Sequence, residues 1–400
     1  MLPSYIHQLP DGSELGRFLS LDVGGSTLRV ALIELRGNST AQGVESMEIL
    51  RKDTYKITPE LKSLEGMKFF DWIAVRILEV MSQDLGDVIQ TACIGRGLRV
   101  KVAAVVNDSA AALLSAAYIQ NATRFGLVLG TGVNIAIHLP VRAVGTAKFG
   151  ARPATWFDEA SHVIVNTELG MFGHGILPVT RWDALLNEQH LKPDFQPLEY
   201  MVSGCYLGEI ARLALLEAVE SAGLFGGDVP PSLLTPYALD TETLSVMETD
   251  KSSSLELATS VFHEKHPTGS GAPLSIADIR VVCTLASLIA QRSAAILGAS
   301  VYALWALKVE TERELIEANL VEAHTRNAQA ELAILQSRTV VAFNGSVMEQ
   351  YPHYREHCQA VIDSLATEKT SATTSTIDLV PAEESSLLGA VVALACLRAE

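Results

Sequence analysis

The sequence predicts an α/β fold organised in two domains. Residues 15–35 and 123–138 each contain two apolar stretches that flank a short turn rich in glycine and hydroxyl side chains. Between these segments, the β-branched run 102–106 and the small residues 110–117 are typical of a buried strand that leads into a helix. Four hundred residues exceed what one ordinary core accommodates, which favours two domains.

The amino-acid composition argues against some classes of function. The chain has 30 basic and 46 acidic residues and a net charge of −16, which argues against nucleic acid or an anionic membrane as the main partner. A nucleotide remains compatible, because helix N-termini and backbone amides bind phosphates. No secretory signal and no apolar run of transmembrane length is expected. Scattered cysteines without a CxxC pair indicate reduced thiols in an intracellular protein: Cys93, Cys205, Cys283, Cys358 and Cys396.

The two turns are candidates for phosphate binding. Gly24-Gly25-Ser26-Thr27 and Gly130-Thr131-Gly132 combine glycines, which let backbone amides approach a ligand, with hydroxyl donors. Neither matches a GxxxxGK[ST] or GxGxxG loop, and an ordinary hairpin turn is the alternative. Asp22, in the apolar strand before the first turn, needs a partner such as hydrated Mg²⁺ or an amide. Together the turns suggest phosphate-binding hairpins on each side of a cleft.

Asn107, Asp108 and Ser109 follow the predicted strand 102–106. Ligands of open α/β sheets bind at the carboxyl ends of the strands, so Asp108 is a candidate general base. Helix capping is an equally good interpretation, because Asn, Asp and Ser are the preferred N-cap residues.

The rest of the chain alternates predicted helices with polar segments. Residues 308–338 are dense in Glu, Ala, Arg and Leu, which predicts a helical extension with a solvated charged surface; a partner-docking helix is the alternative. Residues 230–268 are predicted to form a loop, and residues 340–347 a strand and turn. Helices are predicted over 69–81, 88–95, 199–220, 275–307 and 387–398.

Seven segments occur in the order expected for the eukaryotic hexokinase family, and the chain resembles a fungal-type member over most of its length. They are LDVGGSTLRV, VVNDSAAAL, LGTGVN, VNTELGMFG, LPVTRWDALLNEQ, EYMVSGCYLGEIARL and FNGSV. The resemblance implies an actin-like ATPase (ribonuclease H-like) fold with two lobes around a central cleft. It implies an N-terminal tail at 1–18, a truncated small lobe at 19–107 to which helix 387–400 returns, and a large lobe at 108–386.

The resemblance further implies ATP-dependent phosphorylation of a glucose-like hexose at its 6-hydroxyl, with Asp108 as the base, in the cytoplasm. Carboxylates and amides suit sugar hydroxyls, and phosphoryl transfer needs mainly positioning and charge stabilisation, with Mg²⁺ carried by the ATP phosphates and no metal site on the protein. The implied sugar ligands are Asn107, Asn134, Asn166, Glu168 and Glu199. The implied ATP ligands are Asp22, Gly24, Gly25, Ser26, Thr27, Arg29, Gly130, Thr131, Gly132, Gly345 and Ser346.

Three departures from the family pattern affect the prediction of hexose kinase activity. The Ser-Phe-Pro and Thr-Lys-Gly segment of the sugar site is absent, and only residues 81–84 bridge the two helices that normally flank it. The usual Thr-Asn of the first turn is Ser26-Thr27, and the Asp before the last Gly-Ser is Asn344. The turn before the last helix, residues 383–387, has lost its glycines.

These departures favour, as the alternative, a catalytically impaired hexokinase-like regulatory or sugar-signalling protein. Such a protein would act through partners, with residues 308–338 as the candidate docking helix, and a nuclear location would then be compatible. A third reading, an actin- or chaperone-like ATPase, leaves Glu168 and Glu199 unexplained.

Overall fold

The computed structural model describes residues 1–4, 6–23, 27–37, 46–56, 101, 103–370 and 377–398. The helices predicted over 69–81 and 88–95 lie outside these residues. Internal contacts divide the chain into two compact units, which are described separately. Unit 1 comprises residues 1–2, 127–135 and 167–381, and unit 2 comprises residues 3–126, 136–166 and 382–400.

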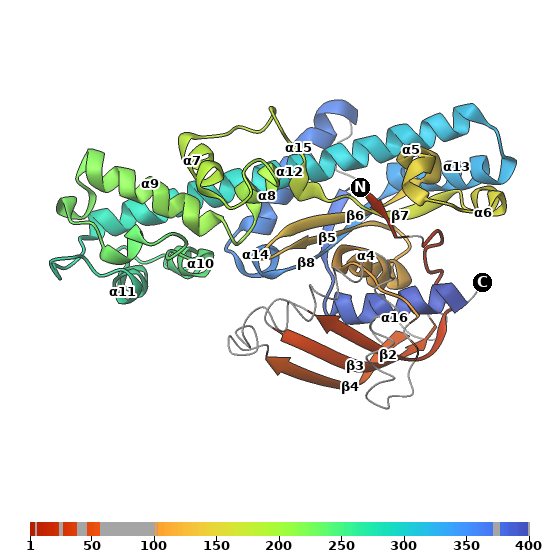
Figure 1. Cartoon of the computed structure of the whole chain (residues 1–400), viewed down its shortest axis with the longest axis horizontal. Coiled ribbons are helices and arrows are strands. Elements are labelled where there is room, and N and C mark those ends of the chain that lie inside the picture. Colours follow the sequence, from red (N-terminus) through yellow and green to blue (C-terminus); the bar gives the residue numbers. More distant parts are fainter. Residues whose placement is uncertain are drawn as a thin grey trace. The chain divides into compact units, whose positions relative to one another are not determined.

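Nine strands occur in the described part of the chain (Figure 1). They are β1 (Leu2–Pro3), β2 (Leu15–Val23), β3 (Thr27–Arg36), β4 (Met47–Lys56), β5 (Thr123–Leu129), β6 (Val133–Pro140), β7 (His162–Asn166), β8 (Thr339–Asn344) and β9 (Ile377–Pro381). A three-stranded antiparallel sheet has the order β2-β3-β4. The other sheet has the order β1-β7-β6-β5-β8-β9, with β6 and β7 antiparallel and β8 and β9 parallel.

The described helices are numbered from α4. They are α4 (Asp108–Ile119), α5 (Val141–Val144), α6 (Ala154–Glu159), α7 (Arg181–Gln189), α8 (Pro197–Val202), α9 (Leu207–Ala222), α10 (Thr241–Glu248), α11 (Glu256–Lys265), α12 (Ile276–Ala318), α13 (Glu322–Ser337), α14 (Ser346–Gln350), α15 (Tyr354–Thr370) and α16 (Ser385–Arg398). Short 3₁₀ helices are formed by Thr146–Phe149, Leu169–Met171, Leu224–Gly227 and Pro231–Leu234.

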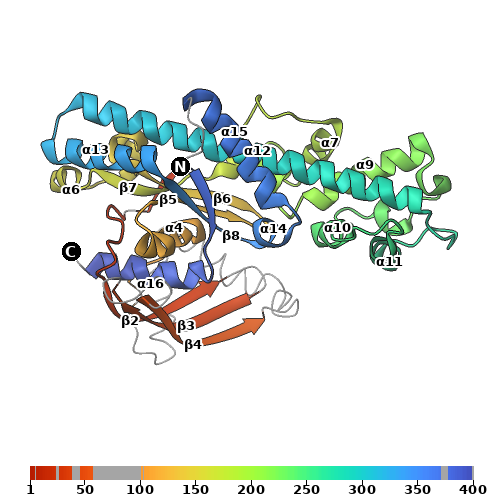
Figure 2. The same cartoon turned by 180° about the vertical axis from the view of Figure 1, so that it is seen from behind.

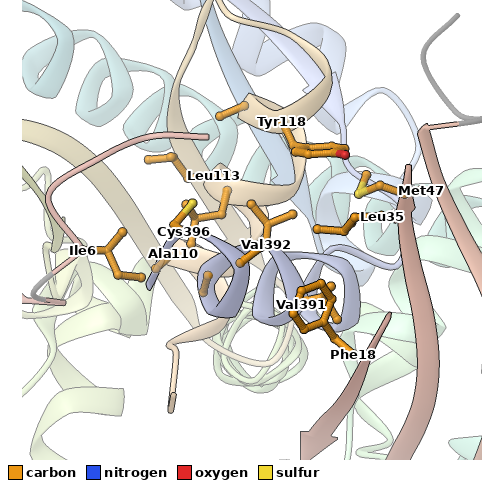
Figure 3. Close-up of a cluster of buried hydrophobic side chains, with 14 of the residues drawn as sticks. Ile6, Phe18, Leu35, Met47, Ala110, Leu113, Tyr118, Val391, Val392 and Cys396 are labelled. Carbon is orange, nitrogen blue, oxygen red and sulfur yellow. The ribbon is translucent and has the colours of Figure 1, made fainter. Parts of the chain in front are cut away.

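The core of unit 2 lies between helices α4 and α16 and the sheet of β2 and β3 (Figure 3). Alternate residues of the strands, such as Phe18 and Ile33, are buried because successive side chains point to opposite faces. The two helices approach closely at Gly389, where an added Cβ would lie 2.0 Å from the carbonyl oxygen of Ala111. Their alanine-rich sequences therefore permit contact between helix backbones that larger side chains would prevent.

Unit 1 contains the longest helix, α12, with α13 and α15 packed against it (Figure 2). Lys308 of α12 is fully buried, and its Nζ lies 2.6 Å from Glu312 Oε1 and 3.0 Å from Glu331 Oε2 of α13. A buried charge requires such pairing, so this ion cluster joins the two helices. Residues 308–338, predicted as a helical extension with a solvated charged surface, form the end of α12 and a second helix, α13, that packs back on it.

Helix α12 also corrects an expectation about apolar runs. It includes an 18-residue window with a mean hydropathy of 1.5, which is long and apolar enough to cross a membrane by length and composition. Half of that window is buried inside the fold, as in the core helix of a globular unit. The expectation that no apolar run reaches this length was therefore wrong; buried core helices also have this length and composition.

Three other predicted elements differ from the structure. Residues 103–107 form no strand and Val105 is exposed, because no strand of the described residues pairs with this run. The predicted helix 199–220 is interrupted between α8 and α9 by residues 203–206. The predicted loop 230–268 contains helices α10 and α11; α10 begins after the N-cap Asp240, a residue type that turns also favour.

Candidate functional site

The turn between β5 and β6 belongs to unit 1 and is held by a neighbouring loop. The amide of Gly130 donates to the carbonyl of Gly132 at 3.0 Å. The amide of Gly204 donates to the carbonyl of Gly130 at 2.8 Å, and that of Cys205 donates to the carbonyl of Thr131 at 3.2 Å. Because these bonds engage the turn's carbonyl groups, the turn is fixed by residues 203–206, the segment that interrupts the predicted helix.

A second glycine turn lies beside the first. Gly345 has φ +115°, and an added Cβ would lie 2.3 Å from the carbonyl oxygen of Leu129, so this position requires glycine. A Cβ built on Gly130 would lie 3.6 Å from the amide nitrogen and 3.6 Å from the hydroxyl of Ser346. Thr131 and Ser346 are exposed at this place. Exposed hydroxyls and closely approaching backbones suit the phosphates of a nucleotide.

The carboxylate of Glu199, in the first turn of α8, packs against the same turn. Its Oε2 accepts a hydrogen bond of 3.0 Å from the amide of Val133. An added Cβ would lie 2.9 Å from Oε2 if built on Gly132, and 3.0 Å from the Cβ of Glu199 if built on Gly170. Two glycines thus make room for this side chain, so the close approach of Glu199 by itself explains a glycine at position 132.

Glu168 and Asn134 form a connected pair in unit 1. Glu168 adopts the left-handed conformation, with φ 58° and ψ 47°, which is uncommon for a residue other than glycine and costs about 1–3 kcal/mol. The side-chain oxygen of Asn134 accepts from the amides of Glu168 at 3.1 Å and Leu169 at 3.4 Å. Asn134 therefore supports the strained turn that carries Glu168, so it has a positioning role whether or not it binds a ligand.

Burial raises the pKa of Glu199 above the ordinary value, and the nearby charge of Glu168 raises this pKa further. The hydrogen bond from Val133 opposes these two effects. Two carboxylates held close together in a half-buried place are unfavourable for folding alone, and this arrangement is typical of a binding site for hydroxyl groups.

Replacing Glu199 with glutamine is expected to raise the free energy of unfolding at pH 7. Because the pKa of Glu199 is raised in the folded state, its contribution to stability falls as the pH rises from about 4.3, the ordinary pKa, through the folded-state pKa. The advantage of Glu199→Gln should therefore disappear at acidic pH. Urea unfolding from pH 4 to 8 measures it, with the exposed Glu220→Gln as control; a pH-independent difference between the variants would contradict this explanation.

In unit 2, Asn107 and Asp108 stand at the start of α4. Asn107 is the N-cap, and its Oδ1 accepts from the amide of Ser109 at 2.9 Å and from its hydroxyl at 2.5 Å. Asp108 is the first residue of the helix and is exposed, and its Oδ1 accepts from the same amide at 2.8 Å. The helix dipole favours a carboxylate at this end. Capping is thus performed by Asn107, and the exposed carboxylate of Asp108 remains suited to accept a proton.

The other predicted ligands of unit 2 lie on two different strand pairs. Asp22 of β2 faces Arg29 of β3 directly across the strand pair and forms an ion pair with it. Asn166 is buried at the end of β7, opposite Ala136 of β6. Thr27 is the first residue of β3, and the predicted ligands Gly24, Gly25 and Ser26 lie outside the described residues.

Two charged residues of unit 2 that were not predicted as site residues contact the predicted ligand Arg29 or its ion-pair partner. They are Glu384 and Lys52. The carboxylate of Glu384 lies 2.7 Å from Lys52 Nζ and 3.4 Å from a guanidinium nitrogen of Arg29. The loss of glycines in the turn 383–387 was the only sequence signal for Glu384. No sequence pattern marks Lys52, because its proximity results from the pairing of β3 with β4.

Comparisons with known proteins identify the family of this chain. A family model for hexokinase matches residues 124–396, and a second hexokinase model matches residues 1–87. Hexokinase-2, chloroplastic, of Nicotiana tabacum is 28% identical over 91% of this chain and 76% of the relative. Hexokinase-1 of Schizosaccharomyces pombe is 25% identical over 98% of this chain and 81% of the relative.

The structural comparison gives the same family. The hexokinase of Schistosoma mansoni complexed with glucose has a TM-score of 0.74 and 25% identity, covering 99% of this chain and 88% of that one. The alignment with the S. pombe relative spans 442 positions although this chain has 400 residues, so more than forty positions of the relative have no counterpart here. The chain therefore belongs to the hexokinase family, as an atypical member with a truncated N-terminal region and the actin-like α/β fold of sugar kinases.

Proposed function

We propose that this chain is an ATP-dependent hexose kinase that phosphorylates a glucose-like sugar at its 6-hydroxyl, with weak activity. Family membership supports sugar phosphorylation in general. The observation that carries the proposal is the placement of Glu199 between Gly132 and Gly170, with the charge of Glu168 nearby. A pair of half-buried carboxylates beside a phosphate-type turn suits a ligand that combines sugar hydroxyls with a phosphoryl donor.

The proposed reaction assigns one role to each group. Glu168 and Glu199 accept hydrogen bonds from sugar hydroxyls, and the turns at Gly130–Gly132 and Gly345–Ser346 receive the ATP phosphates. The 6-hydroxyl oxygen forms a bond to the γ-phosphorus as the bond from that phosphorus to the β,γ-bridging oxygen breaks and ADP leaves. The hydroxyl proton passes to the carboxylate of Asp108. Mg²⁺, brought by the ATP phosphates, supplies charge neutralisation.

A second candidate function is regulation of sugar responses with little catalysis, in the cytoplasm or the nucleus. It is favoured by the ion pairs of Glu384 with Arg29, a predicted ATP ligand, and with Lys52. It is favoured as well by the missing sugar-binding segment. The solvent-facing side of α13, much of which is exposed, is the proposed partner surface in that case.

Ligand-induced thermal stabilisation tests the proposed sites. ATP·Mg²⁺ should raise the melting temperature, since a ligand at 100 times its Kd adds about 2.7 kcal/mol to stability. Glucose at high concentration should do so too, relative to equal mannitol as a control for the general effect of polyols. Gly132→Ala should weaken the glucose effect because the new methyl group displaces the Glu199 carboxylate.

Gly130→Ala is the matched control for that variant. Its methyl group would make only an ordinary contact of 3.6 Å and would leave Glu199 in place, so the glucose effect should persist. An equal loss in both variants would contradict the role given to Glu199. The absence of a shift with any nucleotide, in the unmodified protein, would contradict the kinase proposal itself.

A further inference from the structure

A cluster of four charged residues in unit 2 lies at one end of the buried face of the three-stranded sheet. It consists of Asp22, Arg29, Lys52 and Glu384. In the antiparallel register Asp22 pairs with Arg29, and Lys52 pairs with Ala31, so these side chains share one face of β2, β3 and β4. Ala31 is fully buried on that face, which α16 covers. The charged cluster therefore continues the core face, at the place where the chain enters α16.

Glu384 supplies the carboxylate that holds this cluster together. One of its oxygens lies 2.7 Å from Lys52 Nζ, and the other lies 3.4 Å from an Arg29 guanidinium nitrogen. Its backbone has φ +48°, in the left-handed region that favours glycine. A glutamate at this position thus costs backbone strain, and both of its oxygens are used to bind cations.

Two buried donors of the cluster have no hydrogen-bond partner among the described residues. They are Nε of Arg29 and the hydroxyl of Ser385, whose side chain is 1% exposed. Ser385 directly follows Glu384 and begins the 14-residue helix α16. The carboxylate of Glu384 contacts Lys52 and a terminal guanidinium nitrogen of Arg29, and it satisfies neither of the two buried donors. A phosphoryl group offers three acceptor oxygens and more negative charge, and it suits an arginine, a lysine and a helix N-terminus together.

We propose that Glu384 is an internal competitor for the phosphoryl oxygens of a ligand at Arg29 and Lys52. A phosphorylated ligand must displace the carboxylate from both cations before it binds there, so Glu384 lowers the affinity of this chain for that ligand. This inference rests on the proposed ATP-binding function. It adds that Glu384 regulates the affinity of that site for its ligand. Removing the charge of Glu384 should free Arg29 and Lys52, whereas the pairing of Arg29 with Asp22 persists.

Titration calorimetry of the full chain tests the inference with ATP·Mg²⁺, inorganic phosphate and adenosine as separate probes. Glu384→Gln should bind ATP·Mg²⁺ about twofold to thirtyfold more tightly, the combined effect expected of two partly exposed ion pairs. The exposed neighbour Glu383→Gln removes the same charge one residue away and should bind like the unmodified protein. Adenosine affinity should not change in either variant, because adenosine carries no phosphate.

A second variant shows whether the change in affinity could result from misfolding of Glu384→Gln. Glu384→Gly removes the carboxylate and relieves the left-handed strain, so it should fold at least as well and show the same gain. A gain for inorganic phosphate without one for ATP would support the competitor role and assign the site to a free phosphate or sugar phosphate. Equal affinities in Glu384→Gln and Glu383→Gln, with ATP bound by all variants, would overturn the inference and leave the kinase proposal standing. No ATP binding by any variant would overturn both.

Discussion

Replacing Asp108 with asparagine is expected to reduce hexose phosphorylation about 10²–10⁴-fold while lowering the melting temperature only slightly, since a charge at an exposed helix N-terminus is worth about 0.3–1 kcal/mol. The reduction follows from the loss of a general base, which contributes this range in other enzymes. The small effect on stability follows from the structure, because Asp108 is exposed and its Oδ1 accepts a hydrogen bond from the amide of Ser109. Asparagine keeps an oxygen at that position.

A variant of the neighbouring residue, Asn107, distinguishes a loss of catalysis from a loss of helix capping. Asn107 is the N-cap of α4, so Asn107→Ala should lower the free energy of unfolding by about 0.5–2 kcal/mol. Coupled assays of sugar phosphate formation, with thermal melts of both variants, measure the two effects. A large drop in melting temperature for Asp108→Asn would show that Asp108 acts as a second capping residue and would contradict its catalytic role.

Hexose binding is expected to be weak, roughly a hundredfold to more than ten-thousandfold below that of a family member with the complete sugar site. The chain has no Ser-Phe-Pro or Thr-Lys-Gly segment, so two or three hydrogen bonds to the sugar are lost. Each is worth about 1.5–3 kcal/mol where charged groups take part, and each 1.4 kcal/mol is about tenfold in affinity. The sugar contacts that we propose for Glu168 and Glu199 would not replace those of a second side of the site.

Glucose titration by calorimetry, beside a coupled assay for sugar phosphate, measures this prediction. Glucose affinity should be weaker than millimolar, and turnover should be slow. Sub-millimolar affinity with ordinary turnover would show that another part of the chain replaces the lost contacts. The regulatory alternative would then lose its main support.

Local sequence patterns predicted the elements whose structure depends on near neighbours. The strands around the two glycine turns, β2 with β3 and β5 with β6, follow from apolar runs bounded by Gly, Ser and Thr. Helix α4 follows from small residues after an Asn-Asp-Ser cap, and α16 from an alanine-rich apolar run. In each case the signal and the element lie within a few residues of each other.

Features that depend on distant partners were not predicted. The run 103–106 has strand composition but no pairing strand among the described residues, and strands need a partner. The break between α8 and α9 serves the turn at Gly130, whose carbonyl binds Gly204, 74 positions along the chain. The contact of Lys52 with Glu384 spans 332 positions. The periodicity of apolar residues does not indicate which distant residues will come into contact. The ion pairs of Glu384 were therefore found only in the structure.

Phosphorus NMR of the unmodified protein with glucose and ATP·Mg²⁺ tests the proposed hexose kinase activity, because it distinguishes sugar phosphate from free phosphate. We predict a slow appearance of glucose 6-phosphate with an equal amount of ADP, alongside some free phosphate from ATP hydrolysis, since an incomplete sugar site admits water. In Asp108→Asn the glucose 6-phosphate signal should be absent. Free phosphate as the only product at saturating glucose, or undiminished glucose 6-phosphate in Asp108→Asn, would contradict the account.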